Sequence, residues 1–293
     1  MKPATEQDYY ERIVRTLGYI QKHLDDELEL QDLASVAAFS QFHFHRVFRG
    51  LVGESLKEHI RRLRLERAAQ KLKHQDGPIT GIALEAGFEA HESFTRAFGT
   101  MFGVSPSGYR AAHKPAPESS SGTHLDDVSG YHPPDYGEPL PVEVKDLPPT
   151  QIVFLRHVGP YPQVGATWGR LMSWAGMRGL LGPGMRMIGI VYDDPDVTPI
   201  DKIRYDAALV VNRPVAPQGE FGVTEIPGGK YAVFTHQGPY ETLGRSYERF
   251  FGGWLPKSGR ELRDAEVYEE YLNSPMNTQP EHLLTRIHVP LRG

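Results

Sequence analysis

Two adjacent glutamates stand between tyrosines in the segment Val267–Tyr271. The segment is typical of a strand, and the alternation of a strand sends Glu269 to one face with Tyr271 and sends Glu270 to the other face. One glutamate therefore shares a face with apolar neighbours, where a carboxylate is costly unless a cation arrives. Such a group could bind a lipophilic cation through charge pairing and cation–π contacts, or it could act as a general acid or base.

A second kind of chemistry is indicated by a pattern that occurs twice, fifty residues apart. Arg46 recurs as Arg96, in each case within a short apolar segment. The other residues that recur at the same spacing are Phe44, Phe48, Gly53 and Ser55, matched by Phe94, Phe98, Gly103 and Ser105. Phenylalanines at positions i and i+4 of a helix would pack inward and leave the arginine outward. Because arginine bonds guanine O6 and N7 in bidentate fashion, the repeat favours two helices that read DNA bases.

The two copies predict which side chains face the DNA. The outward positions of the first copy, about residues 40–50, are Gln41, Phe42, His45, Arg46 and Arg49. The outward positions of the second copy, about residues 89–101, are His91, Glu92, Ser93 and Arg96. Between Arg46 and Lys73 the chain has nine Lys and Arg residues against three Glu residues, and Arg61 and Arg64 belong to this basic strip. A solvated helix face and a phosphate-binding surface both fit such a strip.

The elements that must position these side chains are helices. Apolar spacing and capping residues predict helices over about residues 13–24, 30–38, 40–50, 55–74, 79–86 and 89–101, with a short final helix opened by Ser105 and Pro106. A short helix, a tight turn and a reading helix form a helix-turn-helix, so this half is an all-α double helix-turn-helix. We expect one monomer to bind double-stranded DNA in two successive major grooves.

The second half repeats as well. His157-Val-Gly-Pro-Tyr161 returns as His236-Gln-Gly-Pro-Tyr240, and each copy ends a strand and begins a helix. Turn chemistry explains the glycine and proline, and a symmetric cleft between two modules would explain the tyrosines. Strands are predicted at 142–144, 152–157, 187–193, 205–212, 222–226, 231–236, 267–272 and 284–290, with helices at 160–180 and 239–255. This order predicts an α+β domain of two pseudo-symmetric β-α-β-β modules.

Composition sets the domain plan and excludes several kinds of chemistry. Residues 114–141 are rich in Pro, Ser and Gly, so we expect a flexible linker between domains at 1–113 and 142–293, and the sequence leaves open how a signal would cross it. The absence of cysteine excludes disulfides, thiolate zinc sites and thiol nucleophiles. His43 and His45 diverge on a helix, and Gly179–Gly184 matches no phosphate loop, so neither a metal nor a cofactor is expected. With no apolar run near eighteen residues and no signal peptide, the chain is expected to be cytoplasmic without a membrane partner.

Residues 8–112 resemble the AraC-type transcription regulators. The resemblance rests on Leu33-Ala34, on His43-Phe-His-Arg-Val-Phe48, on Gly87-Phe88 with Ser93-Phe-Thr-Arg-Ala-Phe98, and on the closing Phe102-Gly-Val-Ser-Pro-Ser-Gly-Tyr-Arg110. It implies that bases are contacted by Phe42, His45 and Arg46 in the first reading helix and by His91, Glu92, Ser93 and Arg96 in the second. Relatives tend to carry tryptophan in place of Phe42 and glutamine in place of His91 and Glu92. RNA polymerase is a further candidate partner of such a regulator.

Residues 142–291 resemble the GyrI-like effector-binding domain. The matching pieces are the two Gly-Pro-Tyr turns, the stretch from Tyr192 to Asp206, the strand Tyr268-Glu-Glu-Tyr271 and the closing Ile287-His-Val-Pro290. The resemblance implies that a strand glutamate at the bottom of an aromatic cleft contacts the ligand. The expected ligand-binding residues are Tyr161, Trp168, Tyr240, Glu269 and Tyr271.

The two halves together predict a sequence-specific DNA-binding transcription regulator whose C-terminal domain binds a small lipophilic or cationic effector. Some stand-alone relatives of this domain are hydrolases of strained cyclopropane rings. The alternative is therefore a glutamate-dependent hydrolase of small electrophiles that carries a DNA-binding domain, and the sequence leaves open whether the cleft is catalytic. A third alternative is a second domain that only contacts other proteins.

Overall fold

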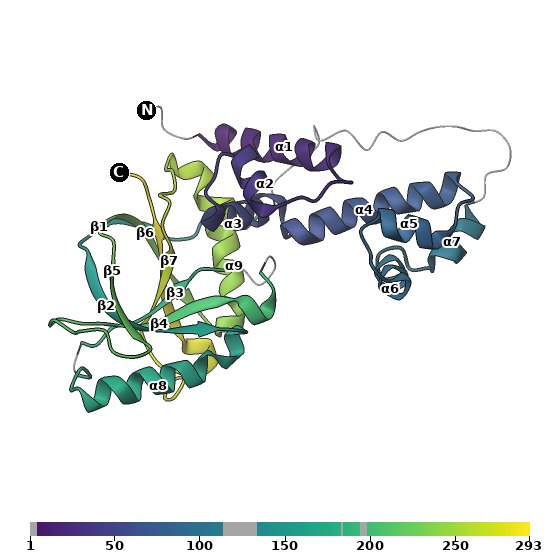
Figure 1. Cartoon of the computed structure of the whole chain (residues 1–293). Coiled ribbons are helices and arrows are strands. Elements are labelled where there is room, and N and C mark those ends of the chain that lie inside the picture. Colours follow the sequence, from purple (N-terminus) through teal and green to yellow (C-terminus); the bar gives the residue numbers. More distant parts are fainter. Residues whose placement is uncertain (1–4, 114–133, 183, 194–197) are drawn as a thin grey trace. The chain divides into compact units, whose positions relative to one another are not determined.

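The computed structural model of the chain describes residues 5–113, 134–182, 184–193 and 198–293 (Figure 1). The chain divides into two compact units, one formed by residues 1–11, 39–53 and 133–293 and the other by residues 12–38 and 54–132. Residues 114–133 of the expected linker and residues 194–197 of the GyrI-like motif lie outside the described residues. The first expected reading helix thus belongs to the same compact unit as the C-terminal half, and the domain boundaries expected from the sequence stay a prediction.

Residues 5–113 are mostly helical, as the sequence predicts. The helices are α1 (Glu6–Lys22), α2 (Leu30–Val36), α3 (Gln41–Val52), α4 (Leu56–His74), α5 (Ile79–Glu85), α6 (His91–Phe102) and α7 (Pro106–Ala112). The repeated glycines end the two reading helices, because Gly53 and Gly103 have φ angles of 82° and 73°, a left-handed conformation that glycine adopts without strain. The repeated phenylalanines are fully buried, as predicted: Phe44, Phe48, Phe94 and Phe98.

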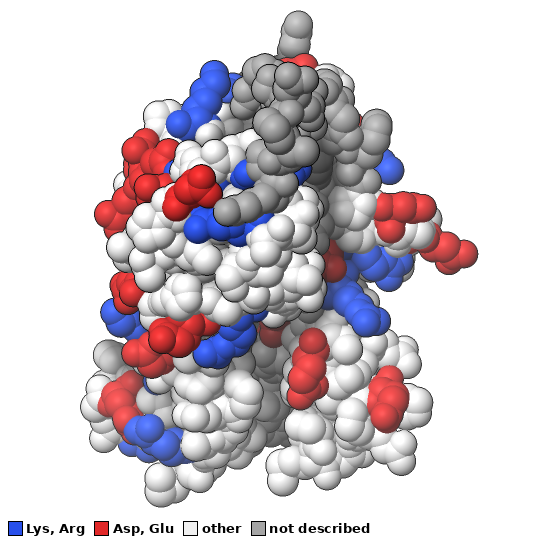
Figure 2. All heavy atoms as spheres, turned by 90° about the vertical axis from the view of Figure 1, so that its right-hand side faces the viewer, with Lys and Arg blue, Asp and Glu red and all other residues white. Residues whose placement is uncertain are grey.

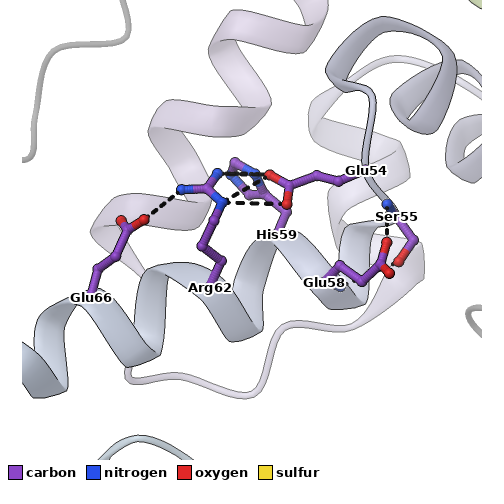
Figure 3. A network of polar contacts seen from close by, with 6 residues as sticks. All are labelled: Glu54, Ser55, Glu58, His59, Arg62 and Glu66. Atoms are coloured by element: carbon purple, nitrogen blue, oxygen red, sulfur yellow. Dashed lines mark hydrogen bonds and ion pairs between the residues drawn. The ribbon is translucent and has the colours of Figure 1, made fainter. Parts of the chain in front are cut away.

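Helix α4 begins at a capping box. The Ser55 side chain accepts a hydrogen bond from the Glu58 backbone N–H, and the Glu58 side chain accepts one from the Ser55 backbone N–H at 2.9 Å (Figure 3). The same pattern of a serine cap recurs at Ser105, whose hydroxyl accepts from Gly108 N–H at the start of α7. Ser55 and Ser105 thus form the predicted capping hydrogen bonds, whereas Ser40, also predicted as a cap, stands at the N-cap of α3 without a side-chain capping hydrogen bond.

The second half contains one antiparallel sheet with the strand order β1-β6-β8-β7-β3-β4-β2-β5. The strands are β1 (Glu143–Leu147), β2 (Thr150–Val158), β3 (Met187–Val191), β4 (Arg204–Val210), β5 (Phe221–Ile226), β6 (Gly229–Gln237), β7 (Val267–Tyr271) and β8 (Leu284–Pro290). The two expected modules are present as β2-α8-β3-β4 and β6-α9-β7-β8. They meet at the centre of the sheet, where β3 pairs with β7 and Gly189 lies opposite Glu269.

Each module also receives an edge strand from the chain segment that precedes the other module. Strand β1 precedes β2 in the sequence but pairs with β6, and β5 precedes β6 but pairs with β2. The sequence does not predict this exchange. It ties the two modules together at both ends of the sheet as well as at its centre.

The two helices that follow the Gly-Pro-Tyr turns are compound, which corrects the continuous helices expected over 160–180 and 239–255. The first is the 3₁₀ turn η1 (Tyr161–Gln163) followed by α8 (Val164–Met177). The second consists of the 3₁₀ turn η3 (Tyr240–Thr242), α9 (Leu243–Glu248), the π-helical turn η4 (Arg249–Trp254) and the 3₁₀ turn η5 (Pro256–Ser258). Helix α8 packs on the sheet over β2 and β4 (Figure 1).

The repeated His-x-Gly-Pro-Tyr motif has the same hydrogen bonds in both modules. His157 Nδ1 lies 3.1 Å from Thr167 Oγ1, and His236 Nδ1 lies 2.8 Å from Ser246 Oγ. The glycines of the two motifs, Gly159 and Gly238, have φ angles of 134° and 137°. The glycines supply the predicted bend, whereas Pro160 and Pro239 stand at the N-cap of the following helical turn and not at N1 as predicted. The histidines tie each turn to the helix that follows it.

Candidate functional site

Glu269 lies at the centre of the sheet on β7, with 5% of its surface exposed. Its Oε1 accepts a hydrogen bond from the Tyr247 hydroxyl of α9, and its Oε2 accepts one from the Tyr271 hydroxyl, both at 2.8 Å. Gly189 on the neighbouring strand leaves room for the phenols of Tyr205 and Tyr271, because a Cβ there would lie 2.5 Å from the Tyr205 hydroxyl and 2.6 Å from that of Tyr271. The buried carboxylate is therefore held by neutral donors.

The aromatic residues expected from the sequence lie around this carboxylate. The Tyr271 ring lies 5.9 Å from the ring of Trp168 and 5.5 Å from that of Tyr240, centroid to centroid. Tyr161 packs edge-on against Tyr205 at 6.0 Å, and the Tyr205 hydroxyl lies 3.0 Å from the Tyr271 hydroxyl. The structure thus brings together all five expected ligand-binding residues.

Two residues of this cluster were not predicted as site residues, Tyr205 and Tyr247. The Tyr205 hydroxyl accepts a hydrogen bond from Trp168 Nε1 at 3.2 Å and forms a second hydrogen bond with the Tyr271 hydroxyl. A signal for Tyr247 is present in the sequence, because it follows Trp168 by the same 79 residues that separate the two Gly-Pro-Tyr turns. Applying the internal repeat to the helices as well as to the turns would have found it.

Burial controls the electrostatics of this cluster. It raises the pKa of Glu269 above the ordinary value, and the hydrogen bonds from Tyr247 and Tyr271 and the charge of Arg46 offset this only in part. Burial, with the nearby Glu269 as the next cause, also raises the pKa of Tyr247 and Tyr271, so both phenols remain donors. A cation that reached Glu269 would stabilise its charged form.

Glu270 shows the opposite behaviour on the other face of the sheet, as the alternation of the strand predicts. It is paired with Arg186 Nε at 2.6 Å and with Arg286 Nη1 at 3.3 Å. Burial alone would raise the pKa of Glu270, but the hydrogen bond and charge of Arg186 lower it overall. Because Glu270 is already paired with two arginines, its role is structural, and Glu269 remains the candidate ligand anchor.

The predicted reading positions of α6 lie on the surface. His91, Glu92, Ser93 and Arg96 are exposed, while Phe94 on the same helix is buried. The buried side packs into a cluster with residues of α4 and α5 such as Leu72 and Ala83. Helix α6 therefore has the inward and outward sides that a reading helix requires.

The predicted reading positions of α3 are placed differently. Gln41 is exposed and Phe42 is partly buried, whereas His45 is buried. Arg49 Nε donates a hydrogen bond to Glu248 Oε1 at 2.8 Å, and the guanidinium carbon of Arg46 lies 5.5 Å from the centre of the Tyr247 ring. Within its compact unit, α3 thus directs its two predicted arginines towards α9.

The basic strip on α4 is largely occupied by contacts within the helical unit. Arg64 donates to the backbone carbonyls of Leu24 and Asp26, and Arg61 stacks over Phe88 at 5.9 Å. Further pairs with acids are formed by Arg62 with Glu54 and Glu66 (Figure 3), by Arg67 with Asp25 and by Lys71 with Glu85. On the face drawn in Figure 2, basic and acidic side chains lie interspersed.

Neither a metal site nor a membrane span is found in the described part of the chain. Its His, Asp and Glu residues form no group of three or more that could hold a metal ion. None of its helices has the length and apolarity needed to cross a bilayer.

Two helix-turn-helix segments before a sheet domain with a buried, aromatic-walled carboxylate define a DNA-binding regulator with a small-molecule domain. Residues 140–292, more than half of the chain, match the GyrI-like small molecule binding domain, and residues 33–112 match a helix-turn-helix domain. The chain belongs to the GyrI-like family, in the architecture in which an AraC-type helix-turn-helix region precedes that domain.

Relatives include proteins of the same length and proteins that share one half. The chain is 25% identical over 301 residues to the right origin-binding protein of Escherichia coli (strain K12), covering 94% of this chain and 96% of that protein. It is 37% identical over 132 residues to the uncharacterized HTH-type transcriptional regulator YbfP of Bacillus subtilis (strain 168), which covers 43% of this chain and 45% of that one. It is 28% identical over 155 residues to the probable transcriptional regulator YgiV of Escherichia coli (strain K12), covering 52% of this chain and 96% of that one.

Proposed function

We propose that the protein is a sequence-specific transcription regulator whose effector is a small lipophilic cation. The observation that carries the proposal is the environment of Glu269, a buried carboxylate with a raised pKa that accepts hydrogen bonds from two phenols. Tyr161, Trp168 and Tyr240 lie around it and offer ring faces and edges.

The chemistry of this site favours a lipophilic cation over a neutral or anionic ligand. A buried carboxylate repels an anion, and it gains nothing from a neutral apolar molecule that leaves its charge uncompensated. A cation without N–H groups gains charge pairing with Glu269 and cation–π contacts with the rings, and its apolar surface leaves water. The effector is therefore a compact aromatic or alkyl cation.

Calorimetry on the full chain tests this. The probe is benzyltrimethylammonium, and neopentylbenzene is its uncharged analogue of the same shape. We expect saturable binding of the cation, little binding of the analogue, and a loss of at least tenfold in affinity with Glu269→Gln. Glu225→Gln removes the same charge from an exposed position on β5 and should bind as the original protein does. Equal affinity of the original protein and Glu269→Gln would contradict the proposal.

The same protein samples address the hydrolase alternative. A carboxylate with a raised pKa also suits proton transfer, so each sample is incubated with a cyclopropane-bearing electrophile and the products are followed by mass spectrometry. An unchanged electrophile supports a sensor. Turnover that Glu269→Gln abolishes would make the protein a hydrolase.

For the helical half we propose direct readout by Arg46 and Arg96, with one monomer spanning two successive major grooves. The support is the repeat itself, the exposed outward face of α6 and the family to which the chain belongs. Selection of bound duplexes from a random library should yield a two-part, non-palindromic site. A single half-site would contradict the two-groove arrangement. Contact with RNA polymerase stays a prediction.

A further inference from the structure

Because α3 and α6 are the two copies of the internal repeat, α6 shows which positions of α3 helix-turn-helix packing alone should bury. Helices α3 and α6 are equivalent at every position fifty residues apart, so helix-turn-helix packing should bury the same positions in both. It does so for the phenylalanines, and also for Val47 and Ala97. Further positions of α3 are buried beyond this pattern. They are His43, His45 and Gly50, and Leu51 is a fourth: the counterparts Ser93 and Thr100 are exposed, and the counterparts Thr95 and Met101 are partly buried.

For His43 and Gly50 the excess burial comes from the second half of the same compact unit. His43 Nε2 donates to the backbone carbonyl of Arg263 at 2.8 Å, and Arg49 pairs with Glu248. Gly50 lies directly against Gly252 of the π-helical turn η4, because a Cβ on Gly50 would lie 2.6 Å from the Gly252 nitrogen. We define the covered face of α3 as His43, Arg46, Arg49 and Gly50. Two of these four, Arg46 and Arg49, are positions that the repeat assigns to DNA reading.

Within the covered face, Arg46 is the residue directed towards the cluster of Glu269, Tyr247 and Tyr271, which we call the Glu269 cluster. Its guanidinium lies over the ring of Tyr247, and the hydroxyl of that same ring donates to Glu269. The positive charge of Arg46 acts on Glu269 and lowers the pKa that burial raises. The proposed effector would place a cation against an aromatic ring near this carboxylate. The Arg46 side chain already provides such a cation.

We propose that Arg46 occupies the effector's place, so that a cationic effector and the DNA-reading face of α3 are coupled by competition for the Glu269 cluster. This inference rests on the proposed function. When the effector binds, Arg46 loses its place over Tyr247, the covered face separates from α9 and η4, and Arg46 becomes available to guanine. Without effector the first reading helix is withheld from DNA while α6 stays exposed.

Binding of the cation by arginine variants tests the competition. In calorimetry on the full chain with benzyltrimethylammonium, Arg46→Ala removes the competitor and should bind at least fivefold more tightly than the original protein. Arg245→Ala removes the same charge from an exposed position on α9 and should not change the affinity. If Glu269→Gln loses binding but Arg46→Ala binds no more tightly, the competition is wrong and the proposed effector site stands. If no variant binds the cation, both are wrong.

A labelling experiment observes the covered face directly. Because the chain has no cysteine, His43→Cys and Ser93→Cys each carry a single thiol, at equivalent positions of the repeat. We expect a maleimide to label Cys at 43 slowly and at 93 rapidly. Saturating benzyltrimethylammonium should accelerate labelling at 43 at least fivefold and leave the rate at 93 unchanged. If calorimetry shows that the cation is bound but the labelling rate at position 43 does not change, the proposal is overturned.

Discussion

Burial replaces the water around Glu269 with two phenol hydrogen bonds and apolar neighbours. The direction of its pKa shift shows which of these effects is larger. Two neutral donors and the nearby Arg46 do not restore what burial removes, because the pKa remains raised. The neutral acid is therefore favoured at this buried site relative to a carboxyl in water. In the proposed function a bound cation would reverse this preference, and the charge of Glu269 would be the property that the effector changes.

This balance predicts how Glu269→Gln alters stability with pH. Since the folded pKa is raised, the folded state binds more protons than the unfolded state above about pH 4.3, and stability falls as the pH rises towards the folded pKa. Gln resembles the neutral acid and avoids this loss. Thermal melting of the full chain without ligand should show the variant more stable than the original protein at pH 7 and equal to it near pH 4. A variant that is less stable at pH 7 would contradict the assignment.

The exposed Arg96 predicts a specific kind of DNA defect. A bidentate contact to guanine contributes to discrimination between bases, so Arg96→Ala should cost about 1–3 kcal/mol on a duplex selected by the protein. Binding to a scrambled duplex should change far less, because phosphate contacts do not depend on sequence. Titrations of both duplexes at one salt concentration measure the two losses. Equal losses on both would mean that Arg96 contacts phosphate.

At the scale of elements, the close crossing of α3 and η4 depends on glycine. A Cβ on Gly252 would overlap the Gly50 carbonyl oxygen, whereas a Cβ on the adjacent Gly253 would meet only Tyr136 at 3.6 Å. Tyr136 also donates a hydrogen bond to the Gly50 carbonyl at 2.5 Å. The π-helical turn therefore presents one glycine to α3 and the next one to a side chain in ordinary contact.

This difference supplies a matched pair of substitutions. Gly252→Ala should push α3 away, raise the labelling of His43→Cys without effector by at least threefold, and tighten binding of the cation. Gly253→Ala makes the same chemical change in the same turn and should do neither. Labelling rates and calorimetry on the two variants decide the matter. If both variants behave alike, the contact between Gly50 and Gly252 does not hold the covered face.

The elements also show what sequence reasoning can and cannot reach. Periodicity and capping residues located the helices, and the alternation in β7 placed Glu269 and Glu270 on the correct faces, because these signals are local. The exchange of β1 and β5 between modules depends on pairing between distant strands and leaves no local pattern. The different burial of α3 and α6 was also out of reach, since the two helices share one pattern and differ only in what packs on them.

At the scale of the whole molecule, the two reading helices are in different situations. The outward face of α6 is exposed, and the covered face of α3 is engaged with α9 and η4. A chain with one available reader should bind DNA through that half-site and gain the second when the effector arrives. The linker expected from the sequence then need not transmit strain, because the effector acts on residues that α3 itself contacts.

Linkage between effector and DNA tests this account most directly. If both ligands draw on one equilibrium, benzyltrimethylammonium must raise the affinity for the two-part duplex, and the duplex must raise the affinity for the cation by the same factor. We predict a factor of at least five in both directions for the original protein and a factor of one for Glu269→Gln, measured by fluorescence anisotropy and calorimetry on the full chain. Equal DNA affinity with and without saturating cation would contradict the account.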